Sequence, residues 1–278
     1  MTESLDFSYQ REFLGSVALV HKCGNIIKDA FFKPKVISVK TEPTDLVTQT
    51  DREVEEVLRK GLALLLPTAP FVGEESSGSG LVVLGNDPTW VVDPLDGTSN
   101  FVHGNPNICI ILCLLVDKKA QFCIVFNPIL NQEWTARRGF GAHYNGTPMH
   151  VSSCKELNKA LLVQQTTPVV SDAVRSIRLK NLATFLPLVQ GLRVTGSSGI
   201  DLAYLAMGAV DAFFHFGHHI WDYAGPALLV EEAGGVVMDP SGSELDPLAR
   251  RSLAASSTIL AEQLLAHVTL LDLGRDGD

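Results

Sequence analysis

The stretch WVVDPLDGTSNFVHGNP, Trp90–Pro106, places two aspartates three positions apart at the end of an apolar run. The apolar residues predict a short strand that ends at Asp93. A proline then stiffens the chain, and Gly97 permits a sharp turn directly after Asp96. Two carboxylates and the Leu95 carbonyl can therefore face one pocket, and hard oxygen ligands of this kind suit Mg²⁺.

The same residues could also form an ordinary β-turn without a metal, since Pro-x-Asp-Gly is a common turn sequence and aspartate often caps such turns. The stretch alone leaves both interpretations open. Thr98 follows the turn, and the letters GTSN offer backbone N–H groups and a hydroxyl at an expected helix or turn start. Such a start binds anions readily, so a metal and a phosphate could share the pocket.

Further acids follow the same pattern in other parts of the chain. Glu74 in VGEES and Asp222 in IWDYAGP come after apolar or aromatic residues and before small or polar ones. Thr50 or Asp51 is the expected N-cap of a helix that ends near Pro67. An acid at a helix start is often only a cap, but four such acids together favour a metal site.

Composition bounds the class of protein. The 278 residues are 46% hydrophobic and 19% charged, which is typical of a well-buried globular enzyme of one large or two closely joined domains. The net charge of -9 argues against binding to nucleic acid. An anionic substrate would then need bound cations to reverse the local sign of charge.

Cysteine usage and hydropathy indicate a cellular location. The five cysteines form no pair at zinc-finger spacing, and three lie in apolar runs, which predicts reduced and buried thiols. The first residues, MTESLDFSYQREF, do not read as a secretory signal, and the apolar runs are too short to span a bilayer. We therefore expect a soluble, cytoplasmic protein with no membrane partner.

Periodicity predicts two linked halves, 1–150 and 151–278, that form one compact unit. The first half is expected to be α+β, with a largely antiparallel sheet and most of the metal ligands, and the second a layered α/β half that completes the site. The expected helices are 6–32, 50–66, 169–188, 200–207 and 221–233. The expected strands of the first half include 90–93, 108–116 and 120–127.

The segments GEES, DPLDGTSNFVHGNP, WDYAGPALLVEEAGG and KTEPTDLVTQTD resemble the inositol monophosphatase family of Mg²⁺-dependent, lithium-sensitive phosphatases. The match runs from about Lys40 to RRSLAASS and so covers nearly the whole chain. The resemblance implies a layered α-β-α-β-α sandwich, a homodimer and inhibition by lithium. It also implies Mg²⁺-dependent hydrolysis of myo-inositol monophosphates by a water that the metal activates.

The resemblance also implies roles for single residues. The metal ligands would be Glu74, Asp93, the Leu95 carbonyl, Asp96 and Asp222. The catalytic residues that orient or deprotonate the attacking water would be Asp51 and Thr98, together with Glu74. The substrate would contact Glu74, Leu95, Asp96, Gly97, Thr98 and Asp222 around the phosphate, and Gly196, Ser197, Ser198 and His215 around the ring.

Two positions depart from the family pattern. His215 stands where the family commonly has a carboxylate or amide, and Gly104 stands where many relatives have arginine. These changes keep open a second interpretation, in which the substrate is another sugar, polyol or nucleotide phosphate. A non-catalytic binding protein would be expected to lack one of the acids, and none is missing.

Three further features of the sequence say less about function. The run HFGHH, which contains His215, His218 and His219, could suggest zinc, although the nearby acids favour an oxygen-ligand site. Lys40 is either solvated or near the metals. The final letters LLDLGRDGD predict nothing about function.

Overall fold

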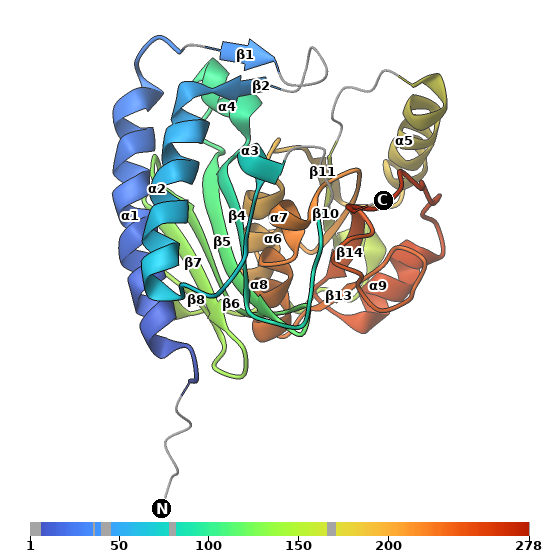
Figure 1. Cartoon of the computed structure of the whole chain (residues 1–278). Coiled ribbons are helices and arrows are strands. Elements are labelled where there is room, and N and C mark those ends of the chain that lie inside the picture. Colours follow the sequence, from blue (N-terminus) through green and yellow to red (C-terminus); the bar gives the residue numbers. More distant parts are fainter. Residues whose placement is uncertain (1–6, 36, 40–45, 78–81, 166–170, 278) are drawn as a thin grey trace, which may run out of the picture.

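The computed structural model describes residues 7–35, 37–39, 46–77, 82–165 and 171–277. Its helices are α1 (Gln10–Phe31), α2 (Gln49–Leu65), α3 (Glu74–Ser77), α4 (Thr98–His103), α5 (Asp172–Phe185), α6 (Ser198–Ala206), α7 (Ile220–Tyr223), α8 (Pro226–Glu232) and α9 (Thr258–Leu265), with a 3₁₀ turn at Leu157–Lys159. The elements stack in the order helices, sheet, helices, sheet, helices, as Figure 1 shows. The predicted layered α+β sandwich is therefore confirmed.

The outer layer consists of α1 and α2, which pack side by side against the first sheet (Figure 1). In α1 the buried side chains Val20, Cys23, Ile27 and Phe31 recur every three or four residues and form one apolar face. The predicted first helix is confirmed within the described residues. In α2 the N-cap is Thr48, not Thr50 or Asp51, and Asp51 occupies the third helical position of a capping box.

The first sheet has seven strands in the order β3-β4-β5-β6-β7-β8-β9. Their bounds are β3 Phe71–Gly73, β4 Thr89–Asp96, β5 Cys109–Val116, β6 Lys119–Asn127, β7 Gln132–Arg137, β8 Ala142–Tyr144 and β9 Thr147–Pro148. All neighbouring strands are antiparallel except β3 and β4, which are parallel. A separate antiparallel pair, β1 (Ile37–Val39) and β2 (Leu46–Thr48), leads into α2 and was not predicted.

The second sheet has five strands in the order β11-β10-β12-β14-β13. Their bounds are β10 Leu161–Gln164, β11 Gly191–Arg193, β12 Ala212–Phe216, β13 Val236–Met238 and β14 Arg251–Ala255. The helices α6 and α8 lie between the two sheets and contact strands of both. On the far side, α9 packs on β14 (Figure 1).

The predicted single helix 221–233 is wrong, because the structure has two short helices there, α7 and α8. Pro226 lacks the N–H that would donate to the Asp222 carbonyl, and its ring would collide with that carbonyl in a continuous helix. The chain therefore restarts at Pro226, which suits the first turn of α8. Of the predicted helix 169–188, residues 172–185 are helical, and 169 and 170 lie outside the described residues.

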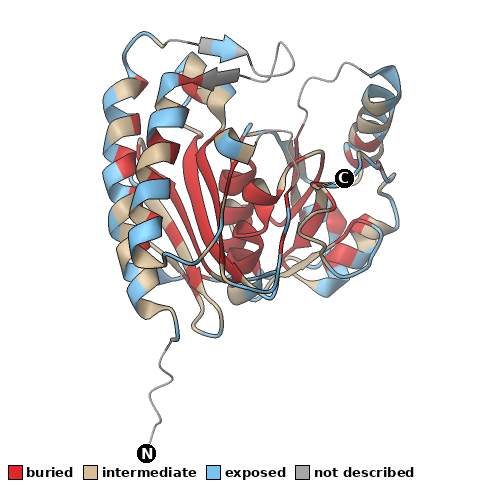
Figure 2. Cartoon of the chain, in the orientation of Figure 1, coloured by how far each residue is buried: buried red, intermediate tan, exposed pale blue. Residues whose placement is uncertain are grey.

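Burial follows the layers. The central strands and the inner helices are buried, while the outer faces of α1, α2 and α5 are exposed (Figure 2). One apolar cluster lies between the first helix layer and the first sheet, a second between the two sheets, and a third behind the second sheet. Over the described ranges, no helix combines the length and apolarity needed to cross a membrane.

Candidate active site

A β-bulge in β4 brings Asp93 and Asp96 onto one side of the sheet. Asp93 pairs with Ile111 and Asp96 with Cys109, so three steps along β4 match two steps along β5. Side chains alternate along a regular strand, and residues three apart would face opposite ways. The extra residue of the bulge shifts the alternation by one position, so that Asp93 and Asp96 face the same way. The strand was predicted to end at Asp93, but it continues through the bulge to Asp96.

Three carboxylates meet at this bulge. One oxygen each from Asp93, Asp96 and Asp222 lies within 4.8 Å of the others. Asp96 comes from the first sheet, yet its Oδ2 accepts hydrogen bonds from Ser197 Oγ and Gly199 N, both at 2.6 Å, on the far side of the cleft. Asp222 comes from α7, and its Oδ2 accepts a hydrogen bond from His219 N at 2.7 Å. The acids are thus held by the first sheet and by the starts of α6 and α7.

The electrostatics of this cluster require a counter-charge. Burial raises the pKa of Asp96 to about 6, and the hydrogen bonds from Ser197 and Gly199 oppose the rise. Burial, together with the neighbouring acids Glu74, Asp96 and Asp222, raises the pKa of Asp93 well above its ordinary value. The pKa of Asp222 is also raised well above its ordinary value, mainly by burial and then by the charges of Asp96 and Glu74. Buried, mutually repelling oxygen donors fit a divalent cation, since its charge would keep all of them ionised.

A test of this cation site needs no substrate. Asp96 has a pKa of about 6 in the folded state against 3.8 ordinarily, so its contribution to stability is complete below about pH 4 and is lost as the pH rises through 6. The Tm of the metal-free protein should therefore fall by roughly 5 °C across this window. Added Mg²⁺ should raise the Tm more at pH 7.5 than at pH 5. Calorimetry in chelator and in Mg²⁺ would measure both, and a Mg²⁺ effect that does not depend on pH would contradict the site.

Asp51 and Thr98 form a hydrogen-bonded pair next to the bulge. Thr98 begins α4 directly after Gly97, whose φ of +90° is open to glycine; a Cβ there would lie 2.9 Å from the Asn107 carbonyl oxygen. Thr98 Oγ1 lies 3.1 Å from Asp51 Oδ1 and 3.2 Å from the Leu95 carbonyl oxygen. Asp51 is fully buried, and this burial raises its pKa, opposed by hydrogen bonds from Thr48.

The expected ring-binding residues line one pocket with two of the acids. The pocket has a volume of about 170 Å³, and its walls are Asp96, Gln165, Gly196, Ser197, Ser198, His215, Gly217, His218 and Asp222. Burial lowers the pKa of His215 to about 3, so this imidazole is neutral. Its Nδ1 lies 3.5 Å from Ser198 Oγ, and its Nε2 is buried with no hydrogen-bond partner among the residues that the structure describes. A ligand hydroxyl could supply that partner.

Sequence reasoning missed three of the pocket residues, Gln165, Gly217 and His218. His218 is buried and stacks on Tyr223 with ring centroids 4.0 Å apart. Within the described chain, the cluster close enough to share an ion contains no histidine, so the geometry does not support zinc at HFGHH. The run HFGHH indicates a histidine-rich segment, but only the fold shows that His215 and His218 line the pocket.

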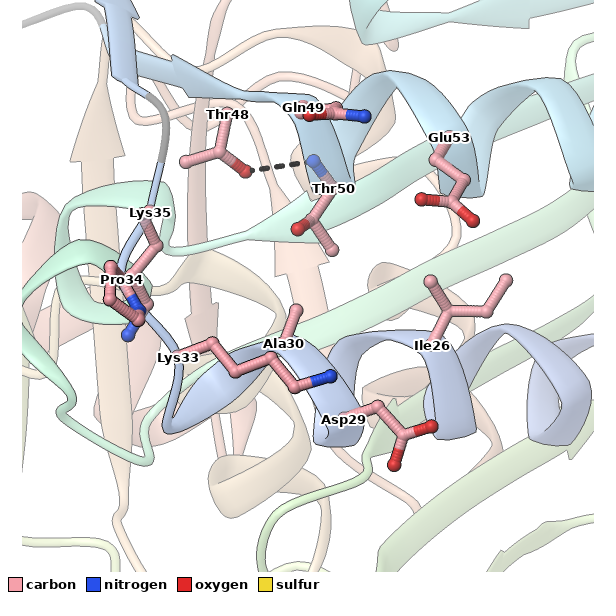
Figure 3. A pocket seen from close by; sticks show the side chains of 10 residues that line it. All are labelled: Ile26, Asp29, Ala30, Lys33, Pro34, Lys35, Thr48, Gln49, Thr50 and Glu53. Carbon is pink, nitrogen blue, oxygen red and sulfur yellow. Dashed lines mark hydrogen bonds between the residues drawn. The ribbon is translucent and has the colours of Figure 1, made fainter.

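Other expected residues lie outside this pocket. Lys40 is outside the described residues. Gly104 ends α4 with a φ of +72°, which explains a glycine at this position irrespective of the substrate. A second hollow of about 380 Å³ lies between the end of α1 and the first turn of α2, where Lys33, Lys35 and Thr50 face it (Figure 3). None of the clustered acids lines it.

Comparison with known proteins agrees with this geometry. The model of the inositol monophosphatase family matches residues 10–272. Inositol monophosphatase 1 of Bos taurus is 36% identical over 265 residues, covering 95% of this chain and 96% of the relative. Inositol monophosphatase 2 of Homo sapiens is 37% identical over 268 residues, covering 96% and 93%.

A solved structure extends the agreement to the fold. The IMPase of Thermotoga maritima superposes with a TM-score of 0.82 at 27% identity, covering 91% of this chain and 95% of that one. The resemblance drawn from the motifs is confirmed over nearly the whole length. This chain belongs to the inositol monophosphatase family.

Proposed function

We propose that the protein hydrolyses myo-inositol monophosphates to inositol and phosphate with Mg²⁺ as its cofactor. The observation that carries this proposal is the meeting of Asp93, Asp96 and Asp222 within 4.8 Å. Asp96 and Asp222 also line the 170 Å³ pocket, which suits a single six-membered ring. Family membership and the names of the relatives support the phosphate monoester as substrate.

The cation ligands in this proposal are Glu74, Asp93, the Leu95 carbonyl, Asp96 and Asp222. Glu74 begins α3, and its charge contributes to the raised pKa of the other three acids. When bound, Mg²⁺ would polarise the phosphoryl oxygens, lower the pKa of a water and neutralise the leaving alkoxide. The protein's own contribution is to hold the acids in place and to supply a proton acceptor.

Asp51 is the proposed acceptor, acting through Thr98. The attacking water gives its proton to Thr98 Oγ1, which gives its own proton to Asp51 Oδ1, 3.1 Å away. Because burial raises the pKa of Asp51, its carboxylate accepts a proton more readily than an exposed aspartate would. The backbone N–H groups that follow Gly97 lie at the start of α4 and would receive the phosphate together with the cations.

The ring would contact Gly196, Ser197, Ser198 and His215. Neutral His215 offers one donor and one acceptor, which matches hydroxyl groups and does not repel a neutral polyol. Phosphate release should therefore be fastest on D-myo-inositol 1-phosphate in a panel that includes 2′-AMP, β-glycerophosphate and 3′-phosphoadenosine 5′-phosphate. If the protein instead preferred one of the other esters in the presence of Mg²⁺, the proposed hydrolysis would stand, but the assignment of inositol monophosphate as substrate would be contradicted.

His215→Ala tests the ring contact. It should raise KM for inositol 1-phosphate about threefold to tenfold, as expected for the loss of one hydrogen bond, with little change in kcat. β-Glycerophosphate, which lacks a ring, is the matched control substrate and should respond weakly. An equal change in KM for both esters would contradict the assignment.

The two halves of the chain, 1–150 and 151–278, are proposed to act as one unit. Asp93 and Asp96 belong to the first half and Asp222 to the second, so neither half holds the acid cluster alone. All five cysteines are free, which supports a reducing compartment, and we propose a cytoplasmic location.

A homodimer is proposed through the side of the molecule that carries α5 and β11. The strand β11 is an edge strand of its sheet, and Leu186 at the end of α5 and Val194 directly after β11 are 65% and 55% exposed. Light scattering should give about twice 30.1 kDa for the wild type and 30.1 kDa for Leu186→Asp combined with Val194→Asp. Leu64→Asp, at a residue of α2 that is 79% exposed, is the control and should stay dimeric. A monomeric wild type would overturn the proposal.

A further inference from the structure

The segment after α9, residues 266–277, returns to the active-site side of the molecule. Figure 1 shows it in dark red beyond α9. Arg250 Nη1 donates a hydrogen bond to the Leu273 carbonyl at 3.1 Å, and Asp276 N donates to the Leu248 carbonyl at 2.9 Å. These contacts bury Asp276, which is 7% exposed. No pattern in the sequence predicts a buried acid here.

Both carboxylate oxygens of Asp276 bind the start of α7. Oδ2 accepts a hydrogen bond from Ile220 N at 2.8 Å, and Oδ1 lies 2.6 Å from His219 Nδ1. Ile220 is the first residue of α7 and His219 is its N-cap. The carboxylate thus satisfies a backbone donor that the helix itself cannot pair, and it fixes the ring of the cap residue.

The same cap residue holds the proposed metal ligand. His219 N donates to Asp222 Oδ2 at 2.7 Å, so His219 is held by Asp222 through its backbone and by Asp276 through its ring. Its ring also stacks on Trp221, with centroids 4.8 Å apart. A helix of four residues has too few internal hydrogen bonds to fix its own direction, so these outer contacts decide where Asp222 points.

We propose that Asp276 is a positioning residue for the metal site: by clamping His219 and Ile220 it aims the carboxylate of Asp222 at Asp93 and Asp96. The inference rests on the proposed function, since it concerns the cation of that site. Asp276 acts through α7 and has no role in contacting substrate. Outer residues that orient a metal ligand typically change metal affinity about 10-fold to 100-fold when replaced.

Direct binding of Mn²⁺ in Mg²⁺-free buffer, followed by electron paramagnetic resonance of the free ion, tests the inference without any assay of activity. Asp276→Asn keeps the size of the side chain but removes the charge and one acceptor oxygen. Asp276→Glu keeps the charge but moves the carboxylate by one methylene. Both should bind Mn²⁺ about 10-fold to 100-fold more weakly than the wild type.

Asp272→Asn is the matched control, because it removes the same charge from the same segment. Asp272 is 80% exposed, and its ion pair with Arg251 is long, at 3.9 Å. An exposed charge is strongly screened by salt, so Mn²⁺ affinity should change less than about twofold. Unfolding curves without metal would show that each variant is folded at the assay temperature.

Full affinity in Asp276→Asn would overturn the inference. Loss in Asp276→Asn with full affinity in Asp276→Glu would overturn it too, because charge and not position would then be the cause. If Asp276→Asn does not fold, His219→Phe tests the same clamp, since it keeps the stack on Trp221 and loses the contact with Asp276. Unchanged Mn²⁺ affinity in that variant would contradict the clamp. A wild type that binds no Mn²⁺ would overturn the proposed function itself.

Discussion

Asp96→Asn should reduce Mg²⁺-dependent phosphate release about 10³-fold or more, because a lost cation contact removes several kcal/mol of transition-state stabilisation. Asp96 Oδ2 accepts hydrogen bonds from Ser197 Oγ and Gly199 N, both at 2.6 Å. The amide oxygen of asparagine can accept these two hydrogen bonds, which turns its NH₂ group toward the other acids. An NH₂ group cannot ligate a cation, so the site loses a ligand while the packing is kept.

The stability of this variant separates loss of the site from loss of the fold. Burial raises the pKa of Asp96 to about 6, so at pH 7.5 the metal-free wild type carries an unfavourable buried charge that asparagine lacks. The Tm of the metal-free variant should equal or exceed that of the wild type, and the rise in Tm on adding Mg²⁺ should shrink. Activity within about tenfold of the wild type would contradict the ligand role.

Asp239→Asn is the matched control for Asp96→Asn. Asp239 is also buried, at 3% exposure, but it pairs with Arg251, whose Nε lies 2.7 Å from Oδ2. Removing its charge should lower the Tm, because Arg251 loses the nearer of its two ionic partners, and should leave the kcat of the folded enzyme unchanged. A fall in kcat comparable to that of Asp96→Asn would mean that any buried acid matters equally.

Asp51→Asn should lower kcat about 10²-fold to 10⁴-fold, the usual range for removing a general base. Its amide oxygen can still accept from Thr48 N, so the capping box of α2 is largely kept. Mn²⁺ affinity should change little, because Asp51 is not among the three clustered acids. Rapid-quench measurement of phosphate release, together with Mn²⁺ titration, would separate the two effects.

Thr98 provides the control for this second prediction. Thr98→Ser keeps the hydroxyl and should keep most of the activity, whereas Thr98→Val has nearly the same shape without the hydroxyl and should match Asp51→Asn. If the pair acts as one relay, Asp51→Asn combined with Thr98→Val should lose no more than either single variant. If the activity loss of the double variant equalled the product of the two single losses, the two residues would act independently.

Much of the fold and of the acid cluster could be predicted, because the signals are local. An apolar run that ends in aspartate, and a glycine directly before Thr98, indicate a strand end and a tight turn whatever the rest of the chain does. The conformation of Gly97, with φ of +90°, agrees with that expectation. The apolar stripe of α1 depends only on helical spacing in the same way.

The features that escaped prediction depend on contacts between distant parts of the chain. Asp276 is buried by residues near 219 and 250, and its own neighbours GRDG suggest an exposed turn. Gln165 faces the pocket only because β10 lies beside β12. The break between α7 and α8 is a local feature instead: Pro226 marks it, while the apolar residues on both sides favour one continuous helix.

The bulge in β4 makes the site sensitive to chain length as well as to chemistry. Three residues of β4 span the interval that two residues span on β5, and this offset is what lets both aspartates face the same way. Inserting one residue between Asp93 and Asp96, with the bulge kept, would add one pleated step and send one carboxylate to the opposite face. Such a chain would retain every acidic residue and still lose the cluster, so an inventory of acids cannot by itself identify an active relative; the spacing between them must be checked as well.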